Sequence, residues 1–343
     1  MERLQVSVEE PRNVDLGGLA AAPGAGIAHE PQLLAALASS YRLRAEVLVA
    51  RRGVTVEGLL PLLRLRGPLG AVFSSVAYLD GGGPAGSDEA RALLVLRAAE
   101  RARARGATLE LRSSLEVPPP PGFTTVVSNK KVTLVRELPS DPDAIVAGLD
   151  PRTRNQLRKA LREGLSSETV PATPEALDSL ACVYARTLRD LGSPPHGLGF
   201  FLEVARALEG RAHVARVLAA GGDFVAAALV LDDRLGGCVL PWAASDRRRD
   251  ALEPNTLLYH ELLAGAVARG RRRFDFGRST IGSPQHRFKE RWGARPVPLH
   301  WTTIGRPVLS REGKLGLLSA AWKRLPVRAS SALGPLVLRW VAA

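Results

Sequence analysis

Short apolar runs separated by turn residues predict a strand meander in the first half of the chain. The runs are AEVLVA (45–50), VTVEGLLPLL (54–63) and AVFSSVAYL (71–79), and RRG and RLRGPLG separate them. Apolar residues then recur at helical spacing over about 87–105. After Gly106 the run TLELR predicts a further strand.

The second half repeats this order. The runs AHVARVLA, FVAAALVL and CVLPWAA lie between 212 and 244 and are separated by GGD and DDRLGG. A helix is expected from about 255 to 269, and the strand RFDFGR follows Gly270. Both helix-to-strand joints run from a basic helix end through glycine and a strand to Arg-Ser. We interpret the chain as a duplicated βββαβ unit. Chance recurrence in an arginine-rich chain is the alternative.

A helical link is expected between the halves, after the run PPPPG at 118–122 that breaks regular structure. Its first helix begins in DPRTRNQLRKALREG, where Asp150 fits the N-cap, Pro151 the first turn and Gly164 the position after the end. Further helices are expected over 174–190 and 197–208.

The first linker helix combines an apolar face with a basic one. Leu157 and Leu161 are one turn apart and are expected to face inward. Three arginines form an i, i+4 row on another face with a lysine beside them: Arg154, Arg158, Arg162 and Lys159. Like charges at this spacing destabilise an isolated helix, so the row favours contact with phosphate. A solvated basic face is the alternative.

The length and net charge of the chain indicate its number of domains and the kind of partner it binds. A chain of 343 residues favours two domains. Lys and Arg number 47 against 34 Asp and Glu, which gives a net charge of +13 and favours anionic partners, although arginine-rich usage is also a habit of some proteomes.

The sequence shows no targeting segment and no cysteine spacing typical of a disulfide or metal site. The N-terminus has no signal-peptide pattern and no apolar run spans a membrane, so we expect a cytoplasmic protein. Cys182 and Cys238 stand alone and are interpreted as small buried hydrophobes, without disulfide or zinc. The tail from about 311 is basic and amphipathic. It is expected to pack on the body or to lie peripherally on the inner face of the membrane.

Four motifs together carry a family resemblance. They are R-x-R-x-x-x-R-K-A-x-x-x-G at 152–164, P-N-x-L-L-Y at 254–259, FDFGRS at 274–279 and FKERWG at 288–293. With them the chain, from about residue 40 to 303, resembles the FemAB-like branch of the GNAT acyltransferase superfamily. In particular it is similar to the FemAB-related proteins of exopolysaccharide and PEP-CTERM/exosortase loci.

The resemblance implies an α/β fold with two tandem GNAT-like (acyl-CoA N-acyltransferase) domains, each a mixed sheet flanked by helices. The expected segments are a first GNAT-like domain at 1–138, a helical linker packed with the second domain at 139–195, a second GNAT-like domain at 196–310, and a basic amphipathic tail at 311–343.

The resemblance also implies an enzyme, an N-acyltransferase. It would move an aminoacyl or acyl group from an activated donor, aminoacyl-tRNA or acyl-CoA, to an amine on a cell-envelope or exopolysaccharide precursor. No metal and no tightly bound cofactor are expected. Two alternatives stay open: an acyl-CoA-dependent N-acyltransferase acting on an amino sugar, and a non-catalytic protein that binds tRNA or another polyanion.

The donor-binding loop departs from the family pattern. GNAT enzymes that use acetyl-CoA usually carry Q/R-x-x-G-x-G/A before the helix that follows the third or fourth strand, but DRRRDALEPN at 246–255 has no glycine. Arg247, Arg248 and Arg249 are candidates to grip phosphates, and an ordinary solvated loop is the alternative. The first half does carry DGGGPAGSDE before its helix, which is weak evidence for a ligand loop.

The resemblance places Lys289 near the reacting end of the donor, where it would stabilise the oxyanion or the leaving ribose oxygen. A surface helix lysine is the alternative. Asp275 is a candidate to accept a proton from the attacking amine or to orient it, unless it is paired with Arg278. The expected substrate-binding residues are Arg278, Ser279, Phe288, Arg154, Arg158, Lys159, Asn255 and Tyr259. Trp242 would stack on a sugar or base, or fill the core.

Overall fold

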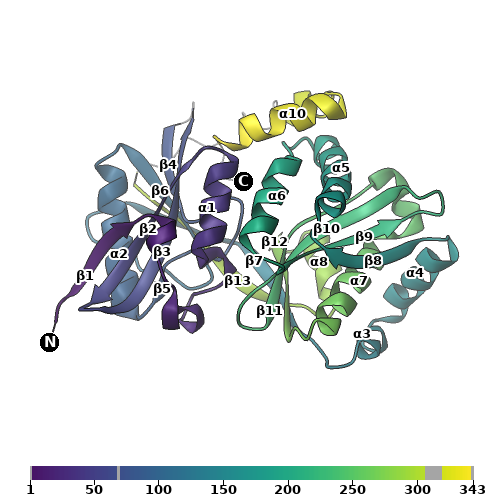
Figure 1. Cartoon of the computed structure of the whole chain (residues 1–343), viewed down its shortest axis with the longest axis horizontal. Helices are drawn as coiled ribbons and strands as arrows, with labels where there is room; N and C mark the ends of the chain where they lie inside the picture. The colour runs from purple at the N-terminus through teal and green to yellow at the C-terminus, as the bar shows by residue number, and fades with distance from the viewer. Residues whose placement is uncertain (1, 68–69, 306–318, 341–343) are drawn as a thin grey trace. The chain divides into compact units, whose positions relative to one another are not determined.

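The computed structural model describes residues 2–67, 70–305 and 319–340, which form two compact units (Figure 1). Unit 1 is formed from the described residues of Met1–Val132, Val297–Leu315 and Leu336–Ala343. Unit 2 is formed from those of Thr133–Pro296 and Gly316–Pro335.

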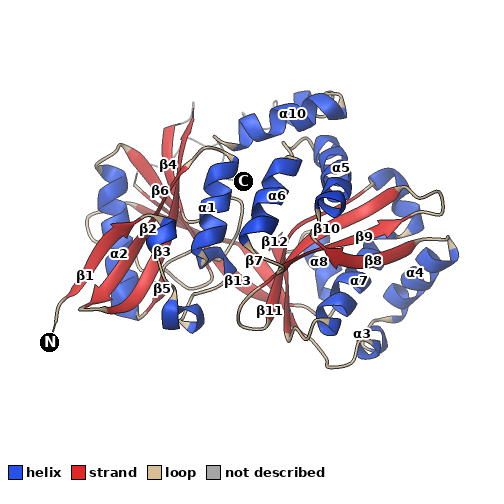
Figure 2. Cartoon of the chain, in the orientation of Figure 1, coloured by secondary structure: helices blue, strands red, loops and turns tan. Residues whose placement is uncertain are grey.

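Unit 1 is a mixed sheet with helices, as Figure 2 shows. Its strands are β1 (Leu4–Glu9), β2 (Arg44–Arg52), β3 (Thr55–Gly67), β4 (Gly70–Ser74), β5 (Ala85–Gly86) and β6 (Ala107–Ser113), and β6 also pairs with β13 (Arg295–Ile304). The order is β1-β2-β3-β4-β6-β13, with β5 on β3. The pair β4–β6 is parallel, and the other pairs are antiparallel. The helices are α1 (Pro31–Ser40) and α2 (Asp88–Arg103), with short 3-10 turns at Pro11–Asn13, Gly17–Ala21 and Ile27–His29.

The core of unit 1 lies between α2 and the sheet. Ser87 caps α2 by accepting a hydrogen bond from Ala90 N, and the buried stripe of the helix, which includes Leu94 and Ala98, packs on Leu62 and Leu109 of the sheet. The expected strand at 71–79 is shorter in the structure, because β4 ends at Ser74 and the chain turns from there.

Unit 2 is also a mixed sheet with helices. Its strands are β7 (Thr125–Glu137), which belongs to unit 2 from Thr133 on, β8 (Ser166–Pro171), β9 (Ala212–Leu218), β10 (Phe224–Asp232), β11 (Gly237–Ser245) and β12 (Arg273–Thr280), in the order β7-β12-β11-β10-β9-β8. The pair β11–β12 is parallel, and β8 to β11 are antiparallel neighbours. The helices are α3 (Asp143–Ala147), α4 (Pro151–Arg162), α5 (Pro174–Leu191), α6 (Leu198–Ala207), α7 (Pro254–Ala268), α8 (Pro284–Glu290) and α10 (Val327–Leu338), which belongs to unit 2 up to Pro335, and a 3-10 turn, η4, covers Arg247–Leu252.

Helices cover both faces of the unit 2 sheet. Helices α5 and α6 pack on one face, and α7, with α4 against it, packs on the other (Figure 1). Strand β10 is therefore buried along its length after Phe224, as expected for a strand covered on both sides. Among the described residues, no helix is long and apolar enough to cross a membrane.

The predicted element order occurs in both units. The series β2-β3-β4-α2-β6 matches β9-β10-β11-α7-β12, and in each series the strand before the helix pairs in parallel with the strand after it. This parallel pair places the Arg-Ser of each half at the end of the last strand, at Arg112-Ser113 and Arg278-Ser279.

Local capping signals were correct for α4, and two burial predictions were wrong. Asp150 accepts a hydrogen bond from Thr153 N, and Gly164 adopts a positive φ of 77° after the helix end. Leu161, however, is 56% exposed, because the buried line of α4 runs through Thr153, Leu157 and Ala160. Cys182 is exposed on the solvent side of α5, whereas Cys238 is buried.

Candidate functional site

The predicted cluster lies where the parallel pair β11–β12 ends. The last registered pair is Val239↔Asp275, although β11 continues to Ser245 and β12 to Thr280. Gly277 has a φ of +72°, and a Cβ there would lie 2.6 Å from the carbonyl oxygen of Leu240. Only glycine fits this turn of β12 against β11.

Asp275 helps to hold that turn. It lies between Phe274 and Phe276, which are both fully buried, and its own side chain is half-buried. The carboxylate accepts hydrogen bonds from the hydroxyl of Thr133 and, at 2.8 Å, from the backbone N–H of Gly277. A donor on β7 and a donor on β12 thus fix the same carboxylate oxygen.

Lys289 binds the other side of the same turn. The side chain, on α8, is only 7% exposed, and its Nζ donates to the carbonyl oxygens of Gly277 at 2.8 Å and Arg278 at 3.0 Å. A buried ammonium requires such partners. Lys289 and Asp275, which the sequence predicted as catalytic, therefore share one segment of β12 backbone.

Arg278 and Ser279 follow directly on β12. Burial raises the pKa of Tyr184 on α5, and the positive charge of Arg278 opposes that rise, so the two side chains are electrostatic neighbours. Ser279 is buried, and its hydroxyl has no hydrogen-bond partner within the described ranges. An unsatisfied buried hydroxyl is a candidate contact for a bound ligand.

An aromatic cluster positions α8 and hence Lys289. Tyr259 on α7 stacks on Phe276 with ring centroids 5.8 Å apart and meets Phe288 edge-on at 4.9 Å. Trp292 is fully buried in the same group. Phe288 and Tyr259, predicted as substrate-binding residues, lie together here as packing partners of β12.

A second aromatic cluster, which the sequence analysis missed, contains Tyr184, His196, Phe200, Phe201 and Trp242. The imidazole of His196 stacks on Phe200 at 4.0 Å, and Trp242 meets Phe200 edge-on at 5.0 Å. Burial lowers the pKa of His196 to about 3, so the ring is neutral near pH 7. Trp242 is buried in this cluster, in agreement with its core interpretation.

The N-terminus of α7 carries a carboxylate of the chain itself. Glu253 adopts a φ of +61° and is the N-cap residue. Its carboxylate accepts from Gln156 Nε2 on α4 at 3.1 Å and from Thr256 Oγ1 at 3.2 Å. The predicted ligand residue Asn255 is half-buried in this first turn. A negative side chain thus occupies the positive end of the helix.

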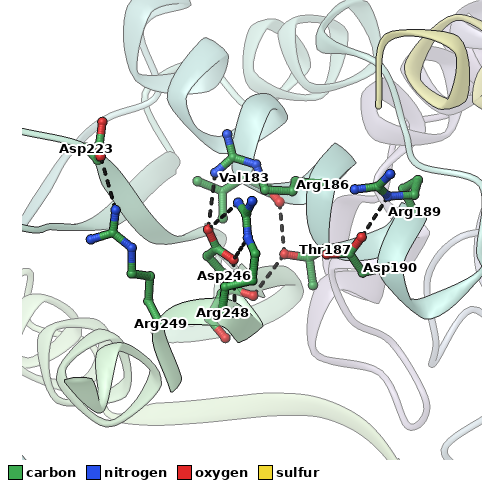
Figure 3. A network of polar contacts seen from close by, with 10 residues as sticks. Val183, Arg186, Thr187, Arg189, Asp190, Asp223, Asp246, Arg248 and Arg249 are labelled. Atoms are coloured by element: carbon green, nitrogen blue, oxygen red, sulfur yellow. Dashed lines mark hydrogen bonds and ion pairs between the residues drawn. The ribbon is translucent and has the colours of Figure 1, made fainter. Parts of the chain in front are cut away.

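Figure 3 shows that two of the three arginines proposed to grip phosphates are paired with carboxylates. Buried Asp246 accepts from Arg248 Nε at 2.9 Å and from a second Arg248 nitrogen at 2.7 Å, and it also accepts from Arg186 at 3.3 Å. These contacts lower the pKa of Asp246 to about 2, chiefly through its hydrogen bond with Arg248. Arg249 pairs with Asp223 at 3.4 Å.

The basic face of α4 differs, because no cation on this helix forms an ion pair with any carboxylate in the part of the chain that the structure describes. Arg154 donates to the carbonyl oxygen of Leu149, and Arg158 donates to Asn155 at 3.1 Å. Arg152, Arg158 and Arg162 are exposed, and Lys159 is half-buried. Since α4 packs on α7, these cations lie on the α7 side of the sheet.

The glycine-rich loop of the first half packs against its own chain. A Cβ on Gly83 would lie 2.4 Å from the Cβ of Ser113. A Cβ on Gly86 would lie 2.1 Å from the carbonyl oxygen of Glu57. Close approach to neighbouring strands accounts for these two glycines without a ligand.

Known proteins share this fold. Residues 151–290 match the family model described as "Acetyltransferase (GNAT) domain". No curated protein matches the chain. The FemX crystal structure is 15% identical, with 92% of this chain and 100% of that chain covered and a TM-score of 0.65.

Two further solved structures are similar. A tandem GNAT protein from the clavulanic acid biosynthesis pathway is 16% identical, with 88% of this chain and 98% of that chain covered and a TM-score of 0.58. The C-terminal domain of a putative lysylphosphatidylglycerol synthetase from Agrobacterium fabrum is 14% identical, with 84% and 91% covered and a TM-score of 0.52. These likenesses show the fold, and they confirm the prediction of a tandem GNAT-like architecture.

Proposed function

We propose that this chain, an acyltransferase of the FemAB-like branch of the GNAT superfamily, transfers an aminoacyl group from the ester of a charged tRNA. The acceptor is an amine on a cell-envelope or exopolysaccharide precursor. The observation that carries the proposal is the contrast between two adjacent helices: the α4 cations have no carboxylate partner among the residues that the structure describes, whereas the Glu253 carboxylate occupies the N-terminus of α7.

The residues present do not fit the pyrophosphate of coenzyme A at α7. A pyrophosphate bound there would meet the Glu253 carboxylate, and like charges this close repel each other. Arg248 and Arg249 are already neutralised by Asp246 and Asp223. Coenzyme A therefore does not fit this end of α7.

The exposed row on α4 instead suits a longer polyanion. Arg158 and Arg162 are exposed one turn apart on the same face of α4, with half-buried Lys159 next to Arg158, and exposed Arg152 lies in the first turn of the helix. Arginines on a helix face bind the phosphates of a nucleic acid backbone, and binding releases counterions. Because α4 is tied to α7 by the Gln156–Glu253 hydrogen bond, a donor held on α4 is held next to the helix that follows β11.

The end of the β11–β12 ladder supplies groups for the chemistry. The neutral amine attacks the ester carbonyl carbon, a C–N bond forms, and the carbonyl oxygen becomes an oxyanion. The oxyanion then re-forms the carbonyl as the acyl C–O bond to the ribose breaks, and the ribose oxygen takes up one proton in exchange for the one that the amine loses. Past Val239, β11 has no registered partner on β12, so its backbone N–H groups on that edge are candidates to bind the oxyanion.

Side chains around the turn have distinct proposed roles. Asp275 accepts the proton that the attacking amine loses, and Arg278 with Ser279 contacts the substrate. Lys289 holds the carbonyl groups of Gly277 and Arg278 and brings a positive charge beside the developing oxyanion.

The test is equilibrium binding of charged tRNA as a function of salt to the wild type and to the triple variant Arg152→Gln/Arg158→Gln/Arg162→Gln. We expect the slope of log K against log salt to decrease by about two to three, at roughly 0.7–0.9 per phosphate contact. The control Arg206→Gln/Arg234→Gln/Arg272→Gln removes the same charge from exposed positions on other elements. Its slope of log K against log salt should stay close to that of the wild type. Equal slopes for the two variants would contradict a binding role for α4.

An acyl-CoA donor is the second candidate, since the matching family model is described as an acetyltransferase domain. Isothermal titration of the wild type with acetyl-CoA and longer thioesters tests it directly. Saturable binding that Glu253→Gln strengthens would favour this candidate, whereas no binding with either protein supports the tRNA donor.

A further inference from the structure

The C-terminal segment carries a large share of the positive charge of the chain. Residues 306–343 contain seven Lys and Arg and one Glu, so they contribute +6 of the net +13. From residue 319 to 340, the part of this segment that the structure describes, the sequence has four cations and no acidic residue. Neither the proposed acyl transfer nor the donor site uses this charge.

Helix α10 presents an apolar stripe to solvent. Leu333, Leu336 and Trp340 are 42%, 52% and 43% exposed and are spaced i, i+3 and i+7, which places them on one side of a helix. Trp340 lies in a turn just after α10 ends at Leu338, and its N–H bonds to the Val337 carbonyl oxygen at 3.0 Å, three residues back. We name these three residues the α10 outer face.

Another side of the helix is already packed. Ser330 is fully buried and accepts a hydrogen bond from Trp322 Nε1 at 2.8 Å. Gly334 lies so close to Pro195 that an added Cβ would be 2.3 Å from the Pro195 carbonyl oxygen. Leu333 and Leu336 lie outside this packing. Trp340 is packed in part, because a Cβ added to Gly67 would lie 2.8 Å from the Trp340 Cβ, but 43% of the residue stays exposed.

Arginines border the α10 outer face. Arg328 and Arg339 are exposed and eleven residues apart, so they fall on one line of the helix, and Arg339 lies three residues after Leu336. Lys323 and Arg324, also exposed, precede the helix. A tryptophan and leucines next to arginines are typical of helices that lie in a lipid–water interface, with the arginines reaching the headgroups.

We propose that the α10 outer face docks on an anionic lipid surface. Leucine and tryptophan side chains enter the interface, and Arg328 and Arg339 bind lipid phosphates. A second copy of the chain is a poorer occupant, because two faces with the same basic border repel each other. The proposal does not depend on the proposed donor, and it would place the acyltransferase at the membrane surface.

The test is co-sedimentation of the full chain with vesicles of phosphatidylcholine alone and with added phosphatidylglycerol. We expect binding only to the anionic vesicles, weakened by salt, and a loss of at least tenfold in affinity for Leu333→Ser/Leu336→Ser/Trp340→Ser. The control Val54→Ser/Val126→Ser/Leu235→Ser changes three exposed apolar residues elsewhere and should bind like the wild type.

A second variant tests the proposal without changing the apolar residues, so a loss of binding cannot be due to misfolding. Arg328→Gln/Arg339→Gln alters only exposed side chains, and it should weaken binding on the order of tenfold without changing the melting temperature. Failure of the wild type to bind anionic vesicles would overturn the proposal, as would equal binding by the serine variant and its control. A concentration-dependent dimer without lipid, abolished by the serine variant, would assign the face to a second copy and equally overturn it.

Discussion

The Nζ of Lys289 and the carbonyl oxygen of Gly277 lie 2.8 Å apart and join α8 to the turn of β12 at which the parallel ladder ends. Lys289 Nζ also donates to the next carbonyl oxygen, that of Arg278, so one buried ammonium group donates to two backbone carbonyl groups. On the other side of the turn, the Asp275 carboxylate accepts a hydrogen bond from the backbone N–H of Gly277. The conformation of residues 275–278 is thus set by two oppositely charged side chains.

Replacing Lys289 by methionine keeps the packing and removes the charge. We expect turnover to fall about a hundredfold, the scale of losing one oxyanion-stabilising group. We also expect the free energy of unfolding to drop by about 1–3 kcal/mol, because two buried carbonyl groups lose their donor. The measurements are aminoacyl transfer from charged tRNA to hydroxylamine and urea unfolding.

Exposed Lys130 on β7 supplies the control, and Lys130→Met should change neither quantity. If Lys289 acts through the backbone turn, the kcat of Lys289→Met falls while its affinity for charged tRNA stays close to that of the wild type. Wild-type turnover in Lys289→Met would remove the residue from the mechanism.

Gly277 is expected to tolerate no side chain. Alanine there must adopt a φ near +72° and also clashes with the Leu240 carbonyl oxygen. Gly282 offers a matched position, because its φ is +74° and no atom of the described residues lies within 4 Å of an added Cβ. Gly282→Ala should cost about 1–2 kcal/mol of stability through its backbone alone. Gly277→Ala should cost clearly more and should abolish turnover; equal costs in urea unfolding would show that β11 does not constrain the turn.

The hydroxyl of Thr133 is expected to stabilise the Asp275 carboxylate. Thr133→Val removes this donor, so stability should fall by about 1–2 kcal/mol and turnover should fall with it. Thr302 is the control: it is buried, and its hydroxyl has no hydrogen-bond partner among the described residues. Thr302→Val should therefore be neutral or slightly stabilising. A neutral Thr133→Val in the same calorimetric comparison would refute the role of this hydrogen bond.

His196 should make the fold sensitive to acid. Its pKa is about 3 in the folded protein and near 6.5 when unfolded, so between these values only the unfolded chain binds the proton. Stability is therefore fully present above pH 6.5 and is lost as the pH falls toward 3, by up to about 1.4 kcal/mol per pH unit. His196→Phe should reduce this slope in urea unfolding between pH 4 and 7. An unchanged slope would show that the imidazole is not buried as a neutral group.

Features that depend on neighbouring residues in the chain, such as helix ends and strand order, could be predicted from the sequence. Helix α4 begins at Pro151, directly after Asp150, and ends before Gly164, as the capping preferences of these residues indicate. Turn residues correctly predicted the repeated order of strands. Contacts between residues distant in sequence were not predictable: 142 positions separate Thr133 from Asp275, and 97 separate Gln156 from Glu253. Nothing in DRRRDALEPN indicates that Arg248 folds back on Asp246.

Burial predictions failed where a helix face could not be assigned from spacing alone. Leu161 follows Leu157 by one turn but lies outside the buried line of α4. Cys182 faces solvent on the same side of α5 as exposed Asp178, one turn earlier. The roles of the predicted site residues, and the boundaries proposed for the domains, remain predictions that variants must test.

The measurement that tests the donor assignment most directly is competition between charged and uncharged tRNA for the wild-type protein at physiological salt. The account predicts saturable binding with a clear preference for the charged form, since the end of the β11–β12 ladder recognises the ester while α4 binds the phosphates. Equal affinity for both forms, together with saturable binding of acyl-CoA, would contradict it.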